Sequence, residues 1–276
     1  MAVDLHIHTT ASDGWLTPVQ VVHKAQAASL AGIAITDHDT LEGLNILKEA
    51  GYLPSASPVI VPGIEFSTDL PEHEVHILAY GMDPQHQELQ NYLQELIRDR
   101  LTRVEKMLAK LTQLGYPLEY RRVRELAGNA KALGRPHVAR ALIEKGYFLT
   151  IAEVFERLLM KNGPAYVPHY KLMPEEVIRL IHRAGGAAVL AHPGQIHNDD
   201  IVAGLITAGL DGLEAYHPHH CADEAERYQQ WALDSGLLTT GGSDYHGMPG
   251  RFPEQLGVFT AEDAVLAQLQ QFLHIA

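Results

Sequence analysis

The pattern that most constrains the fold lies in the first ten residues, where His6 and His8 alternate with the apolar residues Leu5 and Ile7. Side chains two positions apart in a β-strand point to the same face. The two imidazoles therefore project together from one stiff strand and form half of a site for a divalent metal ion. One such pair can also be incidental, so the prediction depends on whether the chain supplies further ligands.

Further groups of metal-ligand type recur down the chain, and at least five fall at or just beyond the C-terminal end of a predicted strand. Open α/β sheets and barrels place their functional groups at this edge. A residue before proline is disfavoured in helical backbone, so we expect His192 to be extended where its strand ends. The groups are Asp37-His38-Asp39, Glu65, His76, His192 and Asp244-Tyr245-His246.

Apolar runs alternate with helical patterns in the order expected for a (β/α) barrel or a wound sheet. The predicted strands are 2–8, 33–36, 59–61, 74–79, 187–191, 211–216 and 237–240. This order is interrupted at 85–115, where apolar residues at helical spacing predict one long helix, with shorter helices after it. We therefore assign 1–86 and 171–276 to the barrel, and 87–170 to a helical insertion that caps the site.

The composition bounds the class of protein. The chain has 276 residues and a hydrophobic content of 46%, as a soluble globular protein does. No apolar run approaches the roughly 20 residues of a membrane helix, and the first strand leaves no room for a signal peptide. The single cysteine suits a reducing compartment, so we expect a cytoplasmic protein.

The formal net charge of −13 argues against stable binding to DNA. It does not argue against a phosphate substrate, because bound metal ions offset the charge of the carboxylates that hold them.

These residues also have ordinary structural explanations. A lone histidine on an apolar strand, such as His76, is more often a hydrogen-bonded core residue. Asp37 and Asp39 can cap a helix or stabilise a loop. We favour His38 as the ligand and the two aspartates as partners that fix its tautomer.

Nine residues of metal-ligand type nevertheless converge on one rim. Four protein ligands per ion would satisfy about two ions, and a bridging Glu65 with water or substrate oxygens would allow three. A mixed nitrogen and oxygen set without cysteine favours manganese, zinc or iron over calcium. The nine are His6, His8, Asp13, His38, Glu65, His76, His192, Asp244 and His246.

Both ends of the chain contain recognisable motifs: DLHIHTTASDG, ITDHDT, PGIEFS, HILAYG, VLAHPG and GGSDYHG. Together they resemble those of the PHP (polymerase and histidinol phosphatase) superfamily, over nearly the whole chain. The middle section, with GRPHVARALIEKGY and GPAYVPHY, is similar to a narrower branch of free-standing PHP phosphoesterases. That branch removes the 3′-phosphate from 3′,5′-nucleoside bisphosphates and also trims short RNA from the 5′ end.

The resemblance implies a distorted seven-stranded (β/α) barrel with a centre of three ions, often Mn²⁺. Many histidinol-phosphatase relatives have histidine at the position of Asp13, so this residue favours the nucleotide branch and disfavours zinc. Carried over by motif, the ligands are His6, His8, Glu65 and Asp244 for one ion, Asp13, His38 and His246 for a second, and Glu65, His76 and His192 for a third.

The hypothesis that follows is hydrolysis of a phosphomonoester by in-line attack of a metal-bound hydroxide. Uncatalysed phosphomonoester hydrolysis is so slow that the barrier must fall by about 20 kcal/mol or more. We assign Asp13, His192 and His246 to catalysis. His192, or His246 through a water molecule, is the candidate for protonating the leaving oxygen.

Substrate selection is expected in the insertion. Arg135 lies at a predicted helix N-terminus, whose free amides and dipole suit a phosphate. Arg100 and Arg103 lie on one stripe of the long helix and could grip a phosphate bidentately, although surface ion pairs explain them equally well. The remaining assignments to substrate binding are Ser12, His137, His217 and His219, the last two of which can also belong to a solvated turn.

Three other functions stay open at this point. One is a phosphatase for histidinol phosphate or another small metabolite. Another is a proofreading-type exonuclease, which should prefer long strands. The third is a non-catalytic, metal-binding regulatory protein, against which the complete ligand set argues.

Overall fold

The computed structural model describes residues 2–53, 57–169 and 173–274. Its strands are β1 (Ala2–Ile7), β2 (Gly32–Ile35), β3 (Val59–Asp69), β4 (Glu74–Tyr80), β5 (Ala187–Leu190), β6 (Gly212–Tyr216), β7 (Leu238–Gly241) and β8 (Ala261–Glu262). Its helices are α1 (Pro18–Ala27), α2 (Glu42–Glu49), α3 (Gln87–Gln113), α4 (Tyr120–Ala127), α5 (Arg135–Glu144), α6 (Ile151–Val154), α7 (Pro174–Arg183), α8 (Asp199–Thr207), α9 (Ala222–Asp234) and α10 (Asp263–Leu273). A π-helical turn, η1 (Phe155–Leu159), and a 3-10 turn, η2 (Pro193–Ile196), complete the set.

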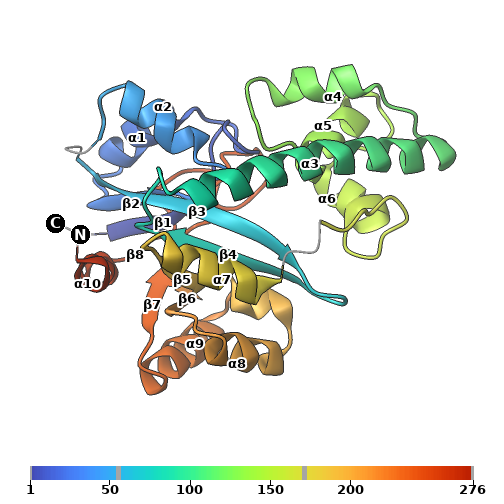
Figure 1. The fold of residues 1–276 in the computed structure, drawn as a ribbon. Coiled ribbons are helices and arrows are strands. Elements are labelled where there is room, and N and C mark those ends of the chain that lie inside the picture. Colours follow the sequence, from blue (N-terminus) through green and yellow to red (C-terminus); the bar gives the residue numbers. More distant parts are fainter. Residues whose placement is uncertain (1, 54–56, 170–172, 275–276) are drawn as a thin grey trace.

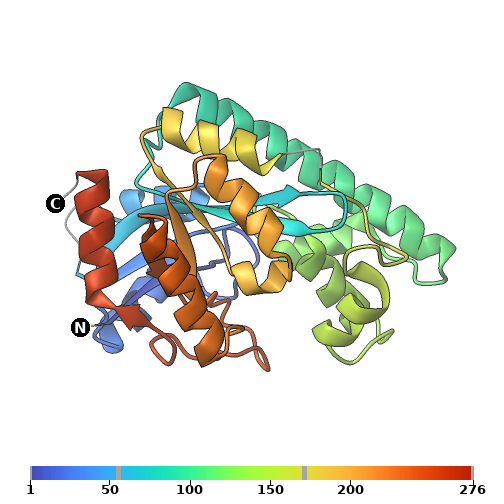
Figure 2. The same ribbon diagram turned by 90° about the horizontal axis from the view of Figure 1, so that it is seen from below.

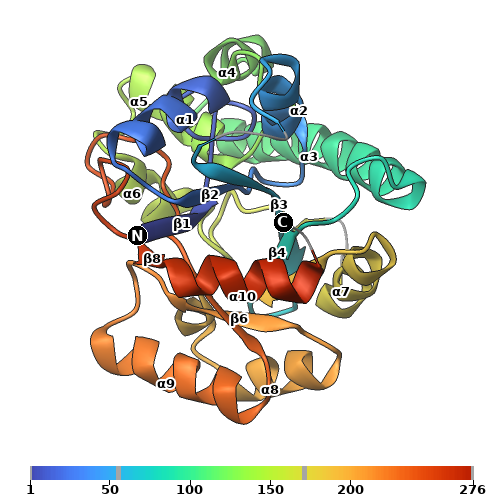
Figure 3. The same cartoon turned by 90° about the vertical axis from the view of Figure 1, so that its left-hand side faces the viewer.

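All of these strands belong to one sheet with the order β7-β6-β5-β4-β3-β2-β1-β8. β1, β2 and β3 are parallel neighbours, as are β5, β6 and β7, whereas β4 runs antiparallel to β3 and β5. The sheet curls into a nearly closed barrel with helices on its outside (Figure 3). The α/β barrel class predicted from the sequence is confirmed.

Closure of the barrel joins β1 to the segment that follows β7. Ile7 forms a bridge with Tyr245, and the His8 backbone N–H donates to the Tyr245 carbonyl at 2.9 Å. Gly242 allows this approach, because a Cβ at that position would lie 2.4 Å from the backbone nitrogen of His6. The two-residue β8 pairs antiparallel with the start of β1 and adds an eighth strand to the seven that the sequence predicts.

β3 is much longer than the predicted strand 59–61. The sequence predicts an end after Val61 because Pro62 and Gly63 follow it. Pro62 removes one donor from the ladder, but its carbonyl still accepts from the Gly81 N–H at 2.9 Å. At Gly63 a Cβ would lie 2.8 Å from the Ile35 carbonyl oxygen, so glycine lets β2 and β3 remain close. The strand therefore continues through Glu65 to Asp69.

The topology brings the predicted site residues to one edge. The carboxyl ends of the parallel strands meet there. Because β4 is reversed, it is the start of this strand that lies at the same edge, and His76 sits there opposite Ser67 of β3.

α3 starts beside the barrel and extends past it toward α4, α5 and α6 (Figures 1 and 2). Its first half buries Leu89, Leu93 and Leu96 in the main core of the barrel. Its second half buries Val104 and Leu111 in a separate hydrophobic cluster with side chains from α4, α5, α6 and η1. The observed helix agrees closely with the predicted one at 85–115.

The division into a barrel and a cap at residues 87 and 170 remains a prediction. Its second boundary falls at 170–172, outside the described residues. Within the described part of the chain, no helix combines the length and the apolar character needed to cross a membrane.

Candidate metal centre and substrate pocket

Seven of the nine predicted ligands line a cavity of about 240 Å³ that also borders α3, α5 and η1, whereas His6 and His8 are not among its lining residues. One wall is rich in imidazoles and carboxylates, and the other contains three arginines. The lining residues are Asp13, His38, Glu65, Ser67, Glu74, His76, Arg100, Arg103, Gly134, Arg135, Pro136, Phe155, His169, His192, Gln195, Asp244, His246 and Arg251.

Glu65 is the centre of the first wall. Its Oε2 atom lies 3.1 Å from His8 Nε2 and 3.0 Å from His38 Nδ1. Its Oε1 atom lies 2.8 Å from His76 Nδ1 and 3.2 Å from His192 Nε2. Glu65 is 1% exposed, so a carboxylate buried within β3 faces imidazoles from four other segments.

Asp13 forms a second focus on the loop after β1. Its Oδ1 atom lies 3.4 Å from His246 Nε2 and 3.7 Å from His8 Nδ1, and its Oδ2 atom lies 3.9 Å from His38 Nε2. Gly14 makes the tight turn possible, since a Cβ there would lie 2.4 Å from the His8 carbonyl oxygen.

Three groups of ligand atoms lie within 4.8 Å of one another: His8, Asp13, His38 and His246; His6, His8, Glu65 and Asp244; and His38, Glu65 and His76. The second group is the four-residue set implied by the motifs. Compared with the sets implied by the motifs, the first group also contains His8, and the third group contains His38 in place of His192. His192 still contacts Glu65 of the third group. The structure therefore brings all nine predicted residues together, and their coordination of specific ions stays a prediction.

The donor atoms themselves fit metal ions. His6 Nε2, His8 Nε2 and Asp13 Oδ1 are buried and have no hydrogen-bond partner in the described part of the chain. Buried polar atoms in proteins are nearly always paired, so unpaired atoms facing one another indicate a missing partner. A nitrogen and oxygen donor set without cysteine is suited to divalent transition-metal ions.

Charges within the cluster offset the cost of burying them. Burial would raise the pKa of Glu65, but His38 and His76 hold that pKa well below its ordinary value. Burial would lower the pKa of His8, but the neighbouring carboxylates of Asp244 and Glu65 raise it to about 9. A cation that binds these imidazoles must therefore displace protons.

Asp37 and Asp39 do not fix the tautomer of His38, and this part of the prediction is wrong. Asp37 accepts from the Thr9 backbone N–H at 2.8 Å and so stabilises the loop after β1. Asp39 accepts from Arg100 Nε at 2.7 Å on the other side of the chain. Alternate side chains in this segment point in different directions, and only that of His38 reaches the Glu65 carboxylate.

His192 is also not extended. It has φ 30° and ψ 58°, which is left-handed backbone. Its N–H donates to Glu214 Oε2 at 2.8 Å, and this bond stabilises a conformation that the preference of pre-proline residues disfavours. The turn aims the His192 ring at Glu65.

The three predicted arginines have different partners. Arg100 donates to Asp39, and its Nη2 donates to Ser67 Oγ at 3.0 Å, so its charge is neutralised. Arg135 starts α5, as predicted, and its Nη1 lies 2.9 Å from Glu74 Oε1.

Arg103 differs from both. Its Nε donates to the Val167 carbonyl at 2.6 Å, and its Nη1 donates to His169 Nε2 at 2.5 Å. Its buried Nη2 atom has no hydrogen-bond partner in the described residues. Burial and the charges of Arg135 and Arg100 lower the pKa of Arg103 to about 10, which still leaves a cation at neutral pH.

Ser12 and His137 have structural roles rather than the predicted contact with substrate, and neither lines the cavity. Ser12 donates to Asp37 Oδ1 at 2.5 Å. His137 is 2% exposed, and its Nδ1 accepts from the Gly134 N–H at 3.1 Å, which fixes the start of α5. Burial lowers the pKa of His137 to about 4.

His217 and His219, which follow β6, differ in their exposure to solvent. His217 is 1% exposed, and its Nε2 lies 3.8 Å from Asp244 Oδ2, so it borders the centre. His219 is exposed, with its ring 5.4 Å from that of His217. A solvated position therefore applies to His219 but not to His217.

Two residues outside the predicted set also contact the centre. Glu214 Oε1 lies 2.9 Å from His6 Nδ1, and Arg251 Nη2 lies 2.5 Å from Asp244 Oδ2. The only signal for Glu214 is that it is the acidic residue in the otherwise apolar strand β6. Arg251 lies in an irregular loop and gives no such signal.

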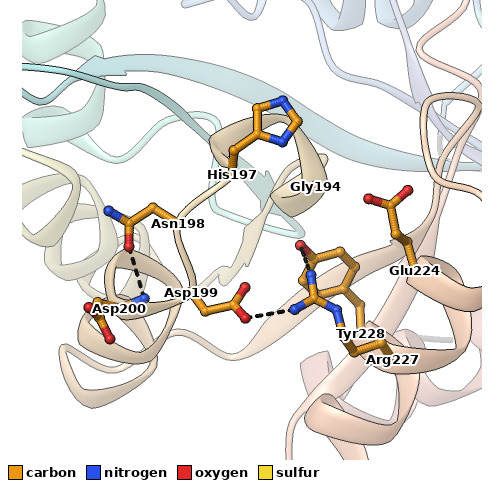
Figure 4. A pocket seen from close by; sticks show the side chains of 8 residues that line it. All are labelled: Gly194, His197, Asn198, Asp199, Asp200, Glu224, Arg227 and Tyr228. Carbon is orange, nitrogen blue, oxygen red and sulfur yellow. Dashed lines mark hydrogen bonds and ion pairs between the residues drawn. The ribbon is translucent and has the colours of Figure 1, made fainter.

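Another pocket lies on the far side of the turn at Gly194 (Figure 4). Its polar side chains pair with their neighbours: Arg227 donates to Asp199 and to the Tyr228 hydroxyl, and Asn198 accepts from the Asp200 N–H. The predicted site residues do not line it.

Comparisons with known proteins identify the family. A family model described as "PHP domain" matches residues 4–133. The 5′-3′ exoribonuclease Rnm of Salmonella typhimurium is 34% identical over 248 residues, which cover 88% of this chain and 84% of that protein. The chain belongs to the PHP family.

Two further PHP-family comparisons are with curated proteins named for different substrates. Phosphoribosyl 1,2-cyclic phosphate 1,2-diphosphodiesterase of Eggerthella lenta is 34% identical over 256 residues, which cover 92% of this chain and 97% of that protein. The 3′,5′-nucleoside bisphosphate phosphatase of Chromobacterium violaceum is 32% identical, with 92% of this chain and 90% of that protein covered. All three relatives are named as enzymes that cleave phosphoesters.

A solved structure supports the same family assignment. A Bifidobacterium adolescentis protein, provisionally described as a metal-dependent phosphoesterase, has a TM-score of 0.87 and 30% identity. The match covers 98% of this chain and 96% of that one. The protein is thus a PHP-family phosphoester hydrolase with residue clusters able to bind metal ions.

Proposed function

We propose that the protein removes the 3′-phosphate from 3′,5′-nucleoside bisphosphates, giving a 5′-nucleotide and inorganic phosphate. One observation carries this choice of substrate: the cavity has a cluster of metal-ligand residues on one wall and arginines on the other. Such a cavity suits a substrate with two phosphates, one beside each wall. The name of the Chromobacterium relative agrees with it.

Arg103 is the residue best suited to the second phosphate. Arg100 and Arg135 already face the carboxylates of Asp39 and Glu74. Among the described residues, by contrast, the hydrogen-bond acceptors of Arg103 are a carbonyl and an imidazole, and its Nη2 has no partner. Charge-assisted hydrogen bonds to phosphate are stronger than neutral ones. A 5′-phosphate against Arg103 would leave the 3′-phosphate on the side of Glu65.

The ions proposed for this centre are three Mn²⁺, with Zn²⁺ or Fe²⁺ as alternatives. Bound divalent ions would lower the pKa of a water molecule and offset charge on the phosphoryl oxygens. Asp13, His192 and His246 remain the proposed catalytic residues. His192, or His246 through a water molecule, remains the candidate for protonating the leaving oxygen.

Trimming of short RNA from the 5′ end is a further part of the proposal, supported by the name of the Salmonella relative. The strongly acidic chain favours small nucleotides and short RNA over stable DNA binding. We place the reaction in the cytoplasm, with residues 87–170 as the cap that selects the substrate.

A second candidate function is hydrolysis of a phosphoribosyl 1,2-cyclic phosphate. The observation that favours it is the Eggerthella relative, which this chain matches over 97% of that protein's length. Such a substrate also has two phosphate groups, so the cavity alone is compatible with both.

A matched substrate panel tests the proposal. With Mn²⁺ and equal substrate concentrations, adenosine 3′,5′-bisphosphate should release phosphate at least tenfold faster, in kcat/KM, than 5′-AMP or histidinol phosphate, and faster than the phosphoribosyl cyclic phosphate turns over. Incubation with EDTA should abolish the activity, and Mn²⁺ should restore it. Preference for the cyclic phosphate would replace the first function by the second, and activity that survives EDTA would contradict both.

A further inference from the structure

The buried Glu214 carboxylate touches two of the predicted metal ligands. Glu214 lies on β6 and is 0% exposed. Its Oε1 lies 2.9 Å from His6 Nδ1, and its Oε2 accepts from the His192 backbone N–H at 2.8 Å. One carboxylate therefore connects β1 with the turn that follows β5.

The contact with His6 decides which ring nitrogen is free. A carboxylate is an acceptor only, so His6 Nδ1 must carry the hydrogen in this contact. In the neutral ring, Nε2 then presents a lone pair. That atom lies 3.4 Å from Glu65 Oε2 and 3.6 Å from Asp244 Oδ1, and it has no hydrogen-bond partner in the part of the chain that the structure describes.

The contact with His192 fixes backbone rather than a ring. His192 adopts left-handed backbone, which costs free energy in a residue with a side chain. The hydrogen bond to Glu214 Oε2 stabilises that turn, and the turn puts His192 Nε2 3.2 Å from Glu65 Oε1. Both arms of Glu214 thus act on atoms that face Glu65.

We propose that Glu214 is a positioning residue that sets the tautomer of His6 and the turn of His192, so that both rings present Nε2 to divalent cations. This inference rests on the proposed metal-dependent function. Carboxylate partners of ligating histidines are known to raise metal affinity about 10- to 100-fold. Glu214 acts through His6 and His192 rather than by contact with substrate.

The sharpest variant is E214Q, because a glutamine has the same size but only one acceptor oxygen. It can accept from His6 or from His192, and its NH₂ group then faces the other donor. Asp211 provides a matched control: it lies just before β6, and its Oδ2 accepts the backbone N–H of Ala188 on β5 at 2.7 Å and lies 2.8 Å from His182 Nε2, outside the proposed metal centre. D211N removes a similar carboxylate at the opposite end of the strand.

Calorimetric titration of metal-free protein with Mn²⁺ measures affinity and stoichiometry without using turnover. We expect E214Q to bind at least one ion per chain about 10- to 100-fold more weakly than wild type and D211N, with the melting temperature of the metal-free protein changed equally in both variants. Unchanged affinity in folded E214Q would overturn the inference. If wild type itself binds no Mn²⁺, the proposed function fails instead.

A measurement on wild type covers the case in which E214Q does not fold. Nitrogen NMR of histidine-labelled, metal-free protein, followed as the pH is raised until the His6 ring becomes neutral, should then show the ring hydrogen on Nδ1. Assignment of the hydrogen to Nε2 would contradict the proposed role of Glu214, whatever the activity of the enzyme.

Discussion

At the scale of single residues, the arginines of the pocket differ in which groups already offset their positive charge. Arg100 and Arg135 have carboxylate partners, whereas Arg103 has a carbonyl and a neutral imidazole. Burial of an unpaired donor is costly. The cost is recovered when an anion enters, so Arg103 should respond to substrate more than its neighbours do.

We expect R103Q to raise KM for adenosine 3′,5′-bisphosphate about 10- to 100-fold, which corresponds to the loss of a charged hydrogen bond. The kcat/KM for 3′-AMP, which lacks the second phosphate, should change less than threefold. R98Q, on the exposed side of the same helix, is the matched control. Equal losses on both substrates would show that Arg103 does not read the second phosphate.

Residue types were easier to predict than orientations. The convergence of the nine ligand-type residues could be predicted, because their periodicity and their place near strand ends are visible in the sequence. The roles of Asp37 and Asp39 were predicted wrongly because these carboxylates accept hydrogen bonds from Thr9 and Arg100. The backbone of His192 was predicted wrongly because its N–H donates to Glu214. Those partners lie far away in the chain, so no local pattern reports them.

At the scale of elements, α3 determines where the arginine wall stands. It packs in the barrel core at one end and in the insertion at the other. Between them, Arg100 and Asp39 form a buried ion pair, 5% and 1% exposed, with Nη2 2.5 Å from Oδ2. This pair attaches the helix to the segment after β2, beside the metal centre.

Replacing Arg100 by Gln should leave Asp39 as an unpaired buried charge. Loss of one partner of such a pair costs about 3–5 kcal/mol of the free energy of unfolding. Urea unfolding of metal-free protein measures it, with R98Q expected to change stability by less than about 0.5 kcal/mol. If both variants unfold at the same urea concentration, α3 does not depend on this pair.

The long helix could be predicted because its apolar spacing is a local signal. The extension of β3 beyond Val61 could not, because proline and glycine ordinarily end strands, and only the neighbouring β2 and β4 show why they are accommodated here. The reversal of β4 was equally hidden. The direction of a strand depends on the neighbouring strands with which it pairs, and the residues of the strand alone do not indicate those neighbours.

At the scale of the whole molecule, cation binding and folding are linked. The site joins segments from both ends of the chain, so cations that bind only the folded state should stabilise all of it. Burial would lower the pKa of His6, but Glu214 and Glu65 raise it well above its ordinary value, and that of His8 is about 9. Both rings therefore hold protons at pH 7 that a cation must displace.

Mn²⁺ at about 100 times its dissociation constant should raise the free energy of unfolding by about 2.7 kcal/mol per site. At a fixed Mn²⁺ concentration the stabilisation should be larger at pH 8 than at pH 6.5, because fewer protons then compete for His6 and His8. Urea unfolding at the two pH values measures the difference, with Ca²⁺ as the control ion. Equal stabilisation by Ca²⁺ would contradict a nitrogen-rich site.

The bridge between Ile7 and Tyr245 has a consequence for biosynthesis. The ribosome delivers Asp244 and His246 more than two hundred residues after His6 and His8. At about 5–20 residues per second, this delay lasts on the order of ten seconds or more. Throughout this interval a nascent chain cannot complete the ligand sets that include Asp244 or His246, so those sets cannot bind a cation before the late segment has been made.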